Sequence, residues 1–249
     1  MPETRVWDGA SYDRISAPME ALGREVLGRL PLGGEELVLD VGCGSGRITE
    51  ALIERLPRGR VIAIDASESM VQAARRRLPD ADVRLMDALE LTLEEPADAI
   101  LSTATFHWIS DHPRLFRSLR AALAPGGLLV AQCGGEGNIA ELRGRAGAVV
   151  AREPYAEHFR GWRPPWNYAG ASETRARLLA AGFTAAECWL ARAPKEPEQP
   201  REFLSTIVLG PHVQRLPEAL REPFIDDVLA ALGEPVVVDY VRLNIDATA

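Results

Sequence analysis

The sequence predicts an α/β fold in which a seven-stranded, mostly parallel sheet carries helices on both faces, with an α-helical and loop insertion that forms a cap. Three observations predict it. Short, continuously apolar runs such as Leu37–Val41 alternate with amphipathic helical patterns, as in sheets buried on both faces. A glycine-rich turn joins the first run to the first helix. The length of 249 residues suits one such domain with an insertion.

The first half of the chain alternates strands and helices after a lead-in helix over 18–30. Apolar runs predict strands, and apolar residues at helical spacing predict helices. Ser67 is expected to cap one helix, and Pro125-Gly126-Gly127 to end another. The expected strands are 37–41, 61–64, 83–86, 99–102 and 128–132, and the expected helices are 47–56, 68–77 and 112–123.

The alternation stops between residues 136 and 171, where two adjacent prolines forbid a continuous helix. We interpret this segment as a cap over the carboxyl ends of the strands, where open α/β sheets bind ligands. The pattern resumes with helix 172–181, strand 186–190, helices 201–209 and 217–232, and an antiparallel strand 236–244. The expected domains are a lead-in lid at 1–34, a core at 35–135, the cap at 136–171, and the completion of the core with an additional helical pair at 172–249.

Composition limits the classes of partner. A net charge of −8 and a single lysine, Lys195, argue against nucleic acid, because phosphate contacts need clustered cations. The three cysteines are widely spaced and show no zinc pattern, so we expect reduced thiols, no metal and a cytoplasmic protein. No signal peptide and no run of about 18 apolar residues is seen, so no membrane partner is expected. Either a monomer or a homodimer is compatible with these features.

The glycine-rich turn has the pattern D-x-G-x-G-x-G, which begins at Asp40 and contains Gly42, Gly44 and Gly46. Glycine lets the backbone approach a ligand closely. A dinucleotide loop instead has the spacing G-x-G-x-x-G, so a nicotinamide-dependent oxidoreductase is the least favoured class. An acid at Asp40 would repel a pyrophosphate but would accept an ammonium group or a ribose hydroxyl.

A second acid, Asp65, ends the second expected strand. A carboxylate in this position can accept both hydroxyls of a ribose. The alternative is that Asp65 only caps the following helix, although Ser67 is the better cap.

The glycine loop, Asp65, Asp87 and the pair His107-Trp108 follow one another as in the class I S-adenosylmethionine (SAM) methyltransferases, which the chain resembles. The resemblance implies a Rossmann-like sheet, SAM as cofactor and S-adenosylhomocysteine as product. It implies that Asp65 binds the ribose, while Asp87 and the backbone N–H of Ala88 bind the adenine. A turn-forming role for Asp87 is the alternative. Thr103 stands where many such enzymes have Asn. The expected cofactor contacts are Asp40, Gly42, Cys43, Gly44, Gly46, Asp65, Ala66, Met70, Asp87, Ala88 and Thr103.

Three further segments resemble the trans-aconitate methyltransferase and small-molecule carboxyl methyltransferase group: Trp7 to Tyr12, Phe106 to His112, and Leu128 to Asn138. This resemblance implies an acceptor acid. His107 could be a base, a hydrogen-bond donor to the acceptor or a structural residue. The expected acceptor contacts are Trp7, Tyr12, His107, Trp108, Trp162, Arg163, Trp166 and Tyr168, with Arg160 a further candidate, although the aromatic residues could equally be packing groups.

We therefore expect methyl transfer to a small molecule, at oxygen and in particular at a carboxylate. Two alternatives stay open: N- or C-methylation of a natural product, and a degenerate SAM-binding or partner-binding module. The acids Asp40, Asp65 and Asp87 argue against the degenerate module. The group is functionally mixed, so the fold cannot identify the acceptor.

Overall fold

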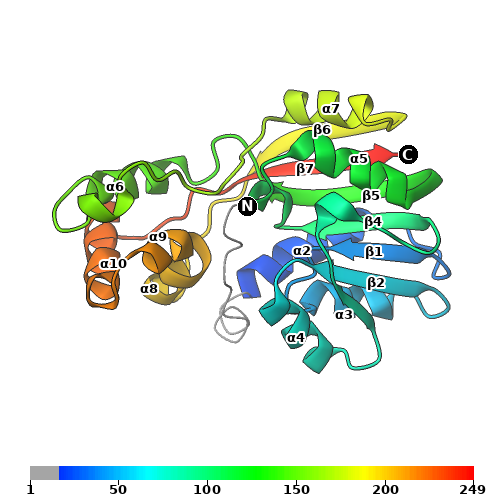
Figure 1. Ribbon diagram of the computed structural model, residues 1–249, viewed down its shortest axis with the longest axis horizontal. Helices are drawn as coiled ribbons and strands as arrows, with labels where there is room; N and C mark the ends of the chain where they lie inside the picture. Colours follow the sequence, from blue (N-terminus) through cyan, green and yellow to red (C-terminus); the bar gives the residue numbers. More distant parts are fainter. Residues whose placement is uncertain (1–16) are drawn as a thin grey trace. The chain divides into compact units, whose positions relative to one another are not determined.

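The computed structural model describes residues 17–249, which divide into two compact units (Figure 1). Unit 1 contains the described residues up to Glu136, together with Asn167–Leu190 and Leu243–Ala249. Unit 2 contains Gly137–Trp166 and Ala191–Arg242. The additional helical pair that we expected in the completion of the core thus lies in unit 2. The residues before Ala17, including the predicted acceptor contacts Trp7 and Tyr12, lie outside the described part of the chain.

Unit 1 is built on a seven-stranded sheet of order β3-β2-β1-β4-β5-β7-β6. The pairs β1–β2, β1–β4, β2–β3 and β4–β5 are parallel. Strand β7 runs antiparallel to β5, because Gly126 and Gly127 of β5 exchange backbone hydrogen bonds with Ala249 just beyond its end. The sheet is therefore mixed and mostly parallel, as the sequence predicts. The strands are β1 Leu37–Val41, β2 Arg60–Asp65, β3 Asp82–Leu85, β4 Ala97–Thr103, β5 Leu123–Gly134, β6 Ala185–Arg192 and β7 Val241–Thr248.

Helices cover both faces of this sheet, as Figure 1 shows. On one face, Leu27 and Leu52 of α2 and α3 pack on Val38, and α4 covers β2 and β3. On the other face, Phe116 of α5 and Leu178 of α7 pack on the alternate strand residues. Because the apolar strand residues are buried on both sides, the strands read as continuous apolar runs. The helices are α2 Ala17–Arg29, α3 Arg47–Glu54, α4 Glu68–Arg77, α5 His112–Ala122 and α7 Ala171–Ala180.

Unit 2 is helical, and four of its aromatic side chains surround one histidine. The ring of His212 lies 4.7 Å from that of Trp162 and 5.8 Å from those of Phe159, Trp166 and Phe224, measured between centroids. The cluster brings the two sequence segments of the unit together. Its elements are α6 Ala140–Val150, a 3-10 turn Ala156–Phe159, α8 Pro200–Phe203, a π turn Leu204–Val208, α9 Gly210–Arg215 and α10 Glu218–Leu232.

Three local predictions need correction. Helix α5 ends at Ala122, and Pro125-Gly126-Gly127 lies inside β5, where the register against β4 shifts between Leu123 and Leu128. The proline and glycines therefore form an irregularity in the strand, because Pro and Gly suit a bulge as well as a helix end. The closing strand is Val241–Thr248 instead of 236–244, with an isolated bridge at Val238. The helix expected at 201–209 is divided into α8 and a π turn.

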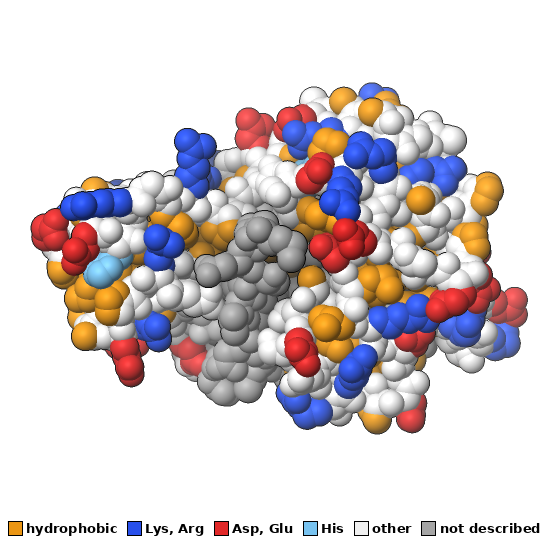
Figure 2. Space-filling model, viewed as in Figure 1, with side chains coloured by type: hydrophobic (Ala, Val, Ile, Leu, Met, Phe, Trp, Pro, Cys, Tyr) orange, Lys and Arg blue, Asp and Glu red, His pale blue; other side chains and the backbone are white. Residues whose placement is uncertain are grey.

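Charged side chains of both signs are interspersed over the face drawn in Figure 2. Many of the arginines have acidic partners: Arg84 pairs with Asp82 and Glu94, and Arg114 pairs with Glu90. This is the solvated arrangement expected when basic residues are scattered along helices. None of the helices in residues 17–249 is long and apolar enough to cross a membrane.

Candidate active site

The glycine-rich turn joins β1 to α3 and is held against the end of β2. The backbone N–H groups of Gly42 and Cys43 both donate to the carbonyl of Ile64, at 2.8 and 2.9 Å. Gly42 and Gly44 have φ values of 75° and 56°, in the left-handed region that favours glycine. A Cβ at Gly42 would overlap the side chain of Thr105, whereas a Cβ at Gly44 would meet no described atom within 4 Å. The turn thus has one packed side and one open side.

Asp65 lies at the carboxyl end of β2 and fixes this turn. Its Oδ2 accepts the N–H of Gly44 at 3.0 Å, and its Oδ1 accepts the N–H of Ser67 at 2.8 Å. Burial raises the pKa of Asp65 above its ordinary value, although the backbone donors oppose this effect. Ser67 is the residue before α4, but its side chain makes no capping bond. Asp65 therefore receives a backbone donor on each side, one from the loop and one from the start of α4.

Asp40 is almost completely buried, with 1% of its surface exposed. Its Oδ2 accepts the hydroxyl of Thr49 on α3 at 2.6 Å, which ties β1 to α3. Burial raises the pKa of Asp40 to about 6, and the nearby charge of Asp65 adds to the shift. Burial also raises the pKa of the Cys43 thiol far above its ordinary value, so Cys43 is a buried neutral thiol and no nucleophile.

Asp87 follows β3, next to the strand that carries Asp65. The N–H of Met86 donates to the carbonyl of Asp65 at 3.0 Å, so the two strand ends lie together. The Oδ1 of Asp87 accepts the N–H of Leu89 at 2.9 Å and caps a short 3-10 turn, Ala88–Glu90. Turn formation by Asp87 is therefore observed, and its side chain is otherwise exposed. Among the remaining predicted contacts, Met70 is buried and Ala66 is exposed.

His107 lies in a 3-10 turn, Phe106–Trp108, that follows β4. Its Nδ1 faces the N–H of Gly134 at the end of β5, at 3.3 Å. A backbone N–H can only donate, so the ring nitrogen that it meets must carry the lone pair. The neutral imidazole of His107 therefore carries its proton on Nε2.

Two aromatic rings of unit 1 lie beside the imidazole of His107. The centroid of Trp108 lies 5.0 Å from that of the imidazole, and the ring of Tyr168 is stacked at 5.8 Å with an interplanar angle of 29°. Thr103, at the end of β4, is opposite Gln132 in β5. The predicted residues His107, Trp108 and Tyr168 are thus brought together. Trp162, Arg163 and Trp166 belong to unit 2, where the two tryptophans join the His212 cluster and Arg163 is exposed, as is Arg160.

The sequence pattern missed four residues that shape the site: Thr49, Thr105, Gly134 and Asn167. Thr49 is the third residue of α3 and could have been found as a polar residue on an apolar helix face. The other three form hydrogen bonds in which one partner is a main-chain group, and no spacing of side chains in the sequence predicts such bonds.

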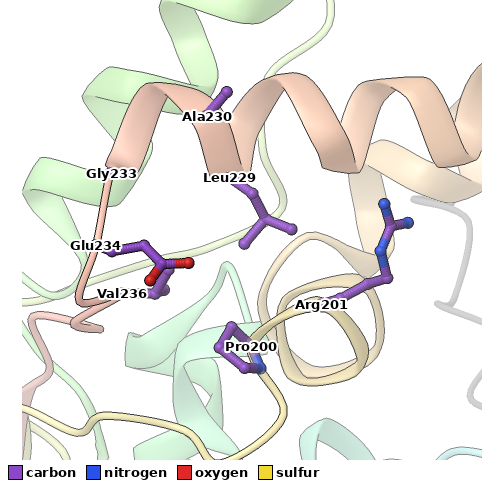
Figure 3. Close-up of a pocket in the computed structure, with 7 residues that line it drawn as sticks. All are labelled: Pro200, Arg201, Leu229, Ala230, Gly233, Glu234 and Val236. Atoms are coloured by element: carbon purple, nitrogen blue, oxygen red, sulfur yellow. The ribbon is translucent and has the colours of Figure 1, made fainter.

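A pocket of about 390 Å³ lies in unit 2, between the start of α8 and the end of α10 (Figure 3). Its wall is mainly apolar, and the guanidinium of Arg201 pairs with Glu222 and Asp226 on α10. None of the predicted site residues within 17–249 lines it. The lining residues are Pro200, Arg201, Leu229, Ala230, Gly233, Glu234 and Val236. Over residues 17–249 the structure shows no group of three or more His, Cys, Asp or Glu side chains that could hold a metal.

The chain is similar to known methyltransferases in sequence. Residues 38–127, which span the glycine turn, Asp65, Asp87 and His107, match the family model of a methyltransferase domain. The chain is 33% identical over 231 residues to a trans-aconitate 2-methyltransferase of Paracidovorax citrulli, covering 88% of this chain and 86% of that protein. It is 32% identical over 187 residues to the enzyme of the same name from Methylobacterium nodulans, covering 75% and 68% respectively.

Solved structures share the fold. A phosphoethanolamine N-methyltransferase 2 of Haemonchus contortus in complex with S-adenosyl-L-methionine superimposes with a TM-score of 0.62 at 18% identity. The match covers 97% of this chain and 56% of that one. At this level of identity the likeness concerns the fold alone.

Proposed function

Because the chain belongs to the class I SAM-dependent methyltransferases, in the family that includes the trans-aconitate 2-methyltransferases, we propose that it methylates a carboxylate of a small organic acid. Trans-aconitate is the first acceptor to test, because it is the acceptor in the names of the similar enzymes. One observation of this chain carries the proposal: the N–H of Gly134 takes the lone pair of His107 Nδ1. In this tautomer Nε2–H can donate a hydrogen bond, and Nε2 cannot accept a proton.

The choice of a carboxylate follows from this tautomer. A hydroxyl acceptor must lose a proton during methyl transfer and so needs a base, whereas a carboxylate is already deprotonated and needs no base. A neutral imidazole that presents Nε2–H suits a carboxylate oxygen, since the hydrogen bond is charge-assisted. In this proposal His107 orients the acceptor, and Trp108 and Tyr168 support its ring. Orientation alone can supply a large part of the rate enhancement in such a displacement.

The residues at the glycine turn fit the cofactor. The open side of Gly44 leaves space that a Cβ would fill, and the backbone can approach a ligand there. We propose that Asp65 accepts the ribose hydroxyls, while Asp87 and the N–H of Ala88 receive the adenine. The other predicted contacts, Gly42, Cys43, Gly46, Ala66, Met70 and Thr103, would surround them, and Asp40 would act on the methionyl part. When bound, SAM supplies a methyl group on a sulfonium.

The other predicted acceptor contacts, Trp162, Arg163 and Trp166, belong to unit 2 and stay predictions from the sequence. Within that unit Arg163 is exposed, and the two tryptophans pack around His212.

The experiment is to incubate the purified protein with SAM and trans-aconitate and to identify the product by mass and by base treatment. A monomethyl ester, which loses its methyl group in base, is the expected product. A phenol and an amine serve as matched acceptors that offer oxygen and nitrogen without a carboxylate. A product that keeps its methyl group in base, or methylation of the amine alone, would contradict carboxylate methylation.

A further inference from the structure

The side chain of Asn167 holds the turn that carries His107. Its Nδ2 donates to the carbonyl of Ile109 at 3.2 Å and to that of Ser110 at 3.1 Å. Its backbone N–H donates to the carbonyl of His107 at 2.8 Å. One residue thus provides three donors to a four-residue segment, although 60 positions separate Asn167 from His107 in the chain.

The same stretch of chain also contacts the imidazole itself. Tyr168, the next residue, stacks on the ring of His107. Asn167 fixes the main chain of the turn, Tyr168 limits the tilt of the ring, and Gly134 determines which nitrogen carries the proton. His107 is therefore constrained through its backbone, its ring face and its Nδ1 by three separate contacts.

The amide of Asn167 bears on position more than on stability. Ile109 is partly buried and Ser110 is exposed, so water can replace the amide at the carbonyl of Ser110. A short turn outside regular structure has few other bonds to keep its geometry, and an error of about 1 Å in a reacting group can reduce turnover about a hundredfold. Loss of the amide should therefore leave the fold intact and let the turn move.

We propose that Asn167 is a positioning residue, which holds residues 107–110 so that the Nε2–H of His107 is directed at the acceptor carboxylate. The proposal rests on the proposed function for the identity of the acceptor. The positioning of His107 can be measured without any acceptor, so the two can fail separately.

The first measurement uses Asn167→Ala, which removes the amide and keeps the backbone donor to His107. Nitrogen-15 NMR of the histidine side chains reports tautomer and environment, and the chain has only four histidines. The variant His107→Gln assigns the His107 signals. We expect Nε2-protonated His107 in the parent and shifted or mixed-tautomer signals in Asn167→Ala. Unchanged signals would overturn the proposal whatever the activity.

Thr184→Ala is the matched control. Thr184 is exposed, and its Oγ1 donates to the carbonyl of Thr248 at 3.2 Å, which is a similar side-chain bond elsewhere in unit 1. The His107 signals should be unaffected in this control. A shift of the same size in Thr184→Ala would also overturn the proposal, because it would show a general effect of losing such a bond.

The second measurement is kinetic, with trans-aconitate as acceptor. Asn167→Ala should reduce kcat/KM about tenfold, the effect expected from losing one or two hydrogen bonds that act on the site, while the affinity for S-adenosylhomocysteine stays constant. The double variant with His107→Gln should be no slower than His107→Gln alone, because Asn167 acts through His107. Additive losses, or an equal loss of S-adenosylhomocysteine affinity, would overturn the proposal. A parent protein inactive on trans-aconitate would refute that acceptor, and the NMR result would still decide whether Asn167 positions His107.

Discussion

Replacing Gly42 and Gly44 separately by Ala tests which side of the glycine turn receives the cofactor. Both residues have positive φ, so each substitution destabilises the folded state through backbone strain of about 1–2 kcal/mol. Each substitution also makes the unfolded chain stiffer, which stabilises the protein by the same amount in both variants. These two effects nearly cancel when the variants are compared with each other. The remaining difference is the surroundings of the new methyl group: packed at Gly42 and open at Gly44.

At Gly42 the methyl group overlaps Thr105, whose Oγ1 donates to the carbonyl of Thr103 at 3.0 Å. Overpacking of this kind adds about 1–3 kcal/mol of destabilisation. For a protein of this size, that difference lowers the Tm of Gly42→Ala by roughly 2–12 °C relative to Gly44→Ala. Thermal unfolding followed by circular dichroism measures it. Equal Tm values for the two variants would refute the packing argument.

Binding shows the opposite order. The methyl group at Gly44 enters the space proposed for the cofactor, so Gly44→Ala should bind S-adenosylhomocysteine at least about tenfold more weakly, a change of about 1.4 kcal/mol. Titration calorimetry on the folded variant gives this value. Gly44→Ala that binds as tightly as the parent would show that the open side of the turn does not face the cofactor.

The remaining predictions concern one acid and two histidines. Asp65→Asn should weaken S-adenosylhomocysteine binding by about 1–3 kcal/mol, because one carboxylate oxygen that accepts hydrogen bonds becomes an amide donor. Unchanged affinity in calorimetry would exclude the proposed ribose contact. His107→Gln, which keeps a side-chain N–H donor, should retain more activity on trans-aconitate than His107→Ala, and both variants should keep the pH profile of kcat of the parent protein. A pH profile that changes shape in both variants relative to the parent would instead indicate that His107 is a base. Burial lowers the pKa of His212 to about 4, below its unfolded value near 6.5, so the unfolded state takes up the proton first and stability falls as pH drops from about 6.5 to about 4. His212→Phe should remove about 3 kcal/mol of this pH dependence in denaturant titrations, and a variant as acid-sensitive as the parent would contradict a neutral His212.

The sequence predicts best what depends on local pattern. Helix α4 has the predicted bounds 68–77, because its apolar spacing is regular and a polar residue precedes it. The acids Asp40, Asp65 and Asp87 lie at or just after the carboxyl ends of the adjacent strands β1, β2 and β3, so their association follows from topology. The prediction for Pro125-Gly126-Gly127 is wrong because the same residues suit a helix end and a strand irregularity, and only pairing with β4 decides between them.

Contacts between distant segments could not be predicted in this way. Asn167 donates to the main-chain carbonyls of His107, Ile109 and Ser110, and a carbonyl is present at every position, so no residue type marks the partner. The tautomer of His107 depends on the N–H of Gly134, and a main-chain N–H is likewise present at every position except proline, so the sequence does not mark it. The association of 137–166 with 191–242 depends on the rings around His212, whose spacing in sequence shows no period.

The place of β7 in the sheet has a consequence for synthesis on the ribosome. This strand lies between β5 and β6, although both precede it in the chain. About 100 residues separate the end of β5 from the start of β7, which corresponds to a delay on the order of 5 to 20 seconds during translation. Throughout that interval the long strand β5 has an unpaired edge, and such edges attract other strands. Nascent chains should therefore depend on chaperones most strongly while unit 2 is being made.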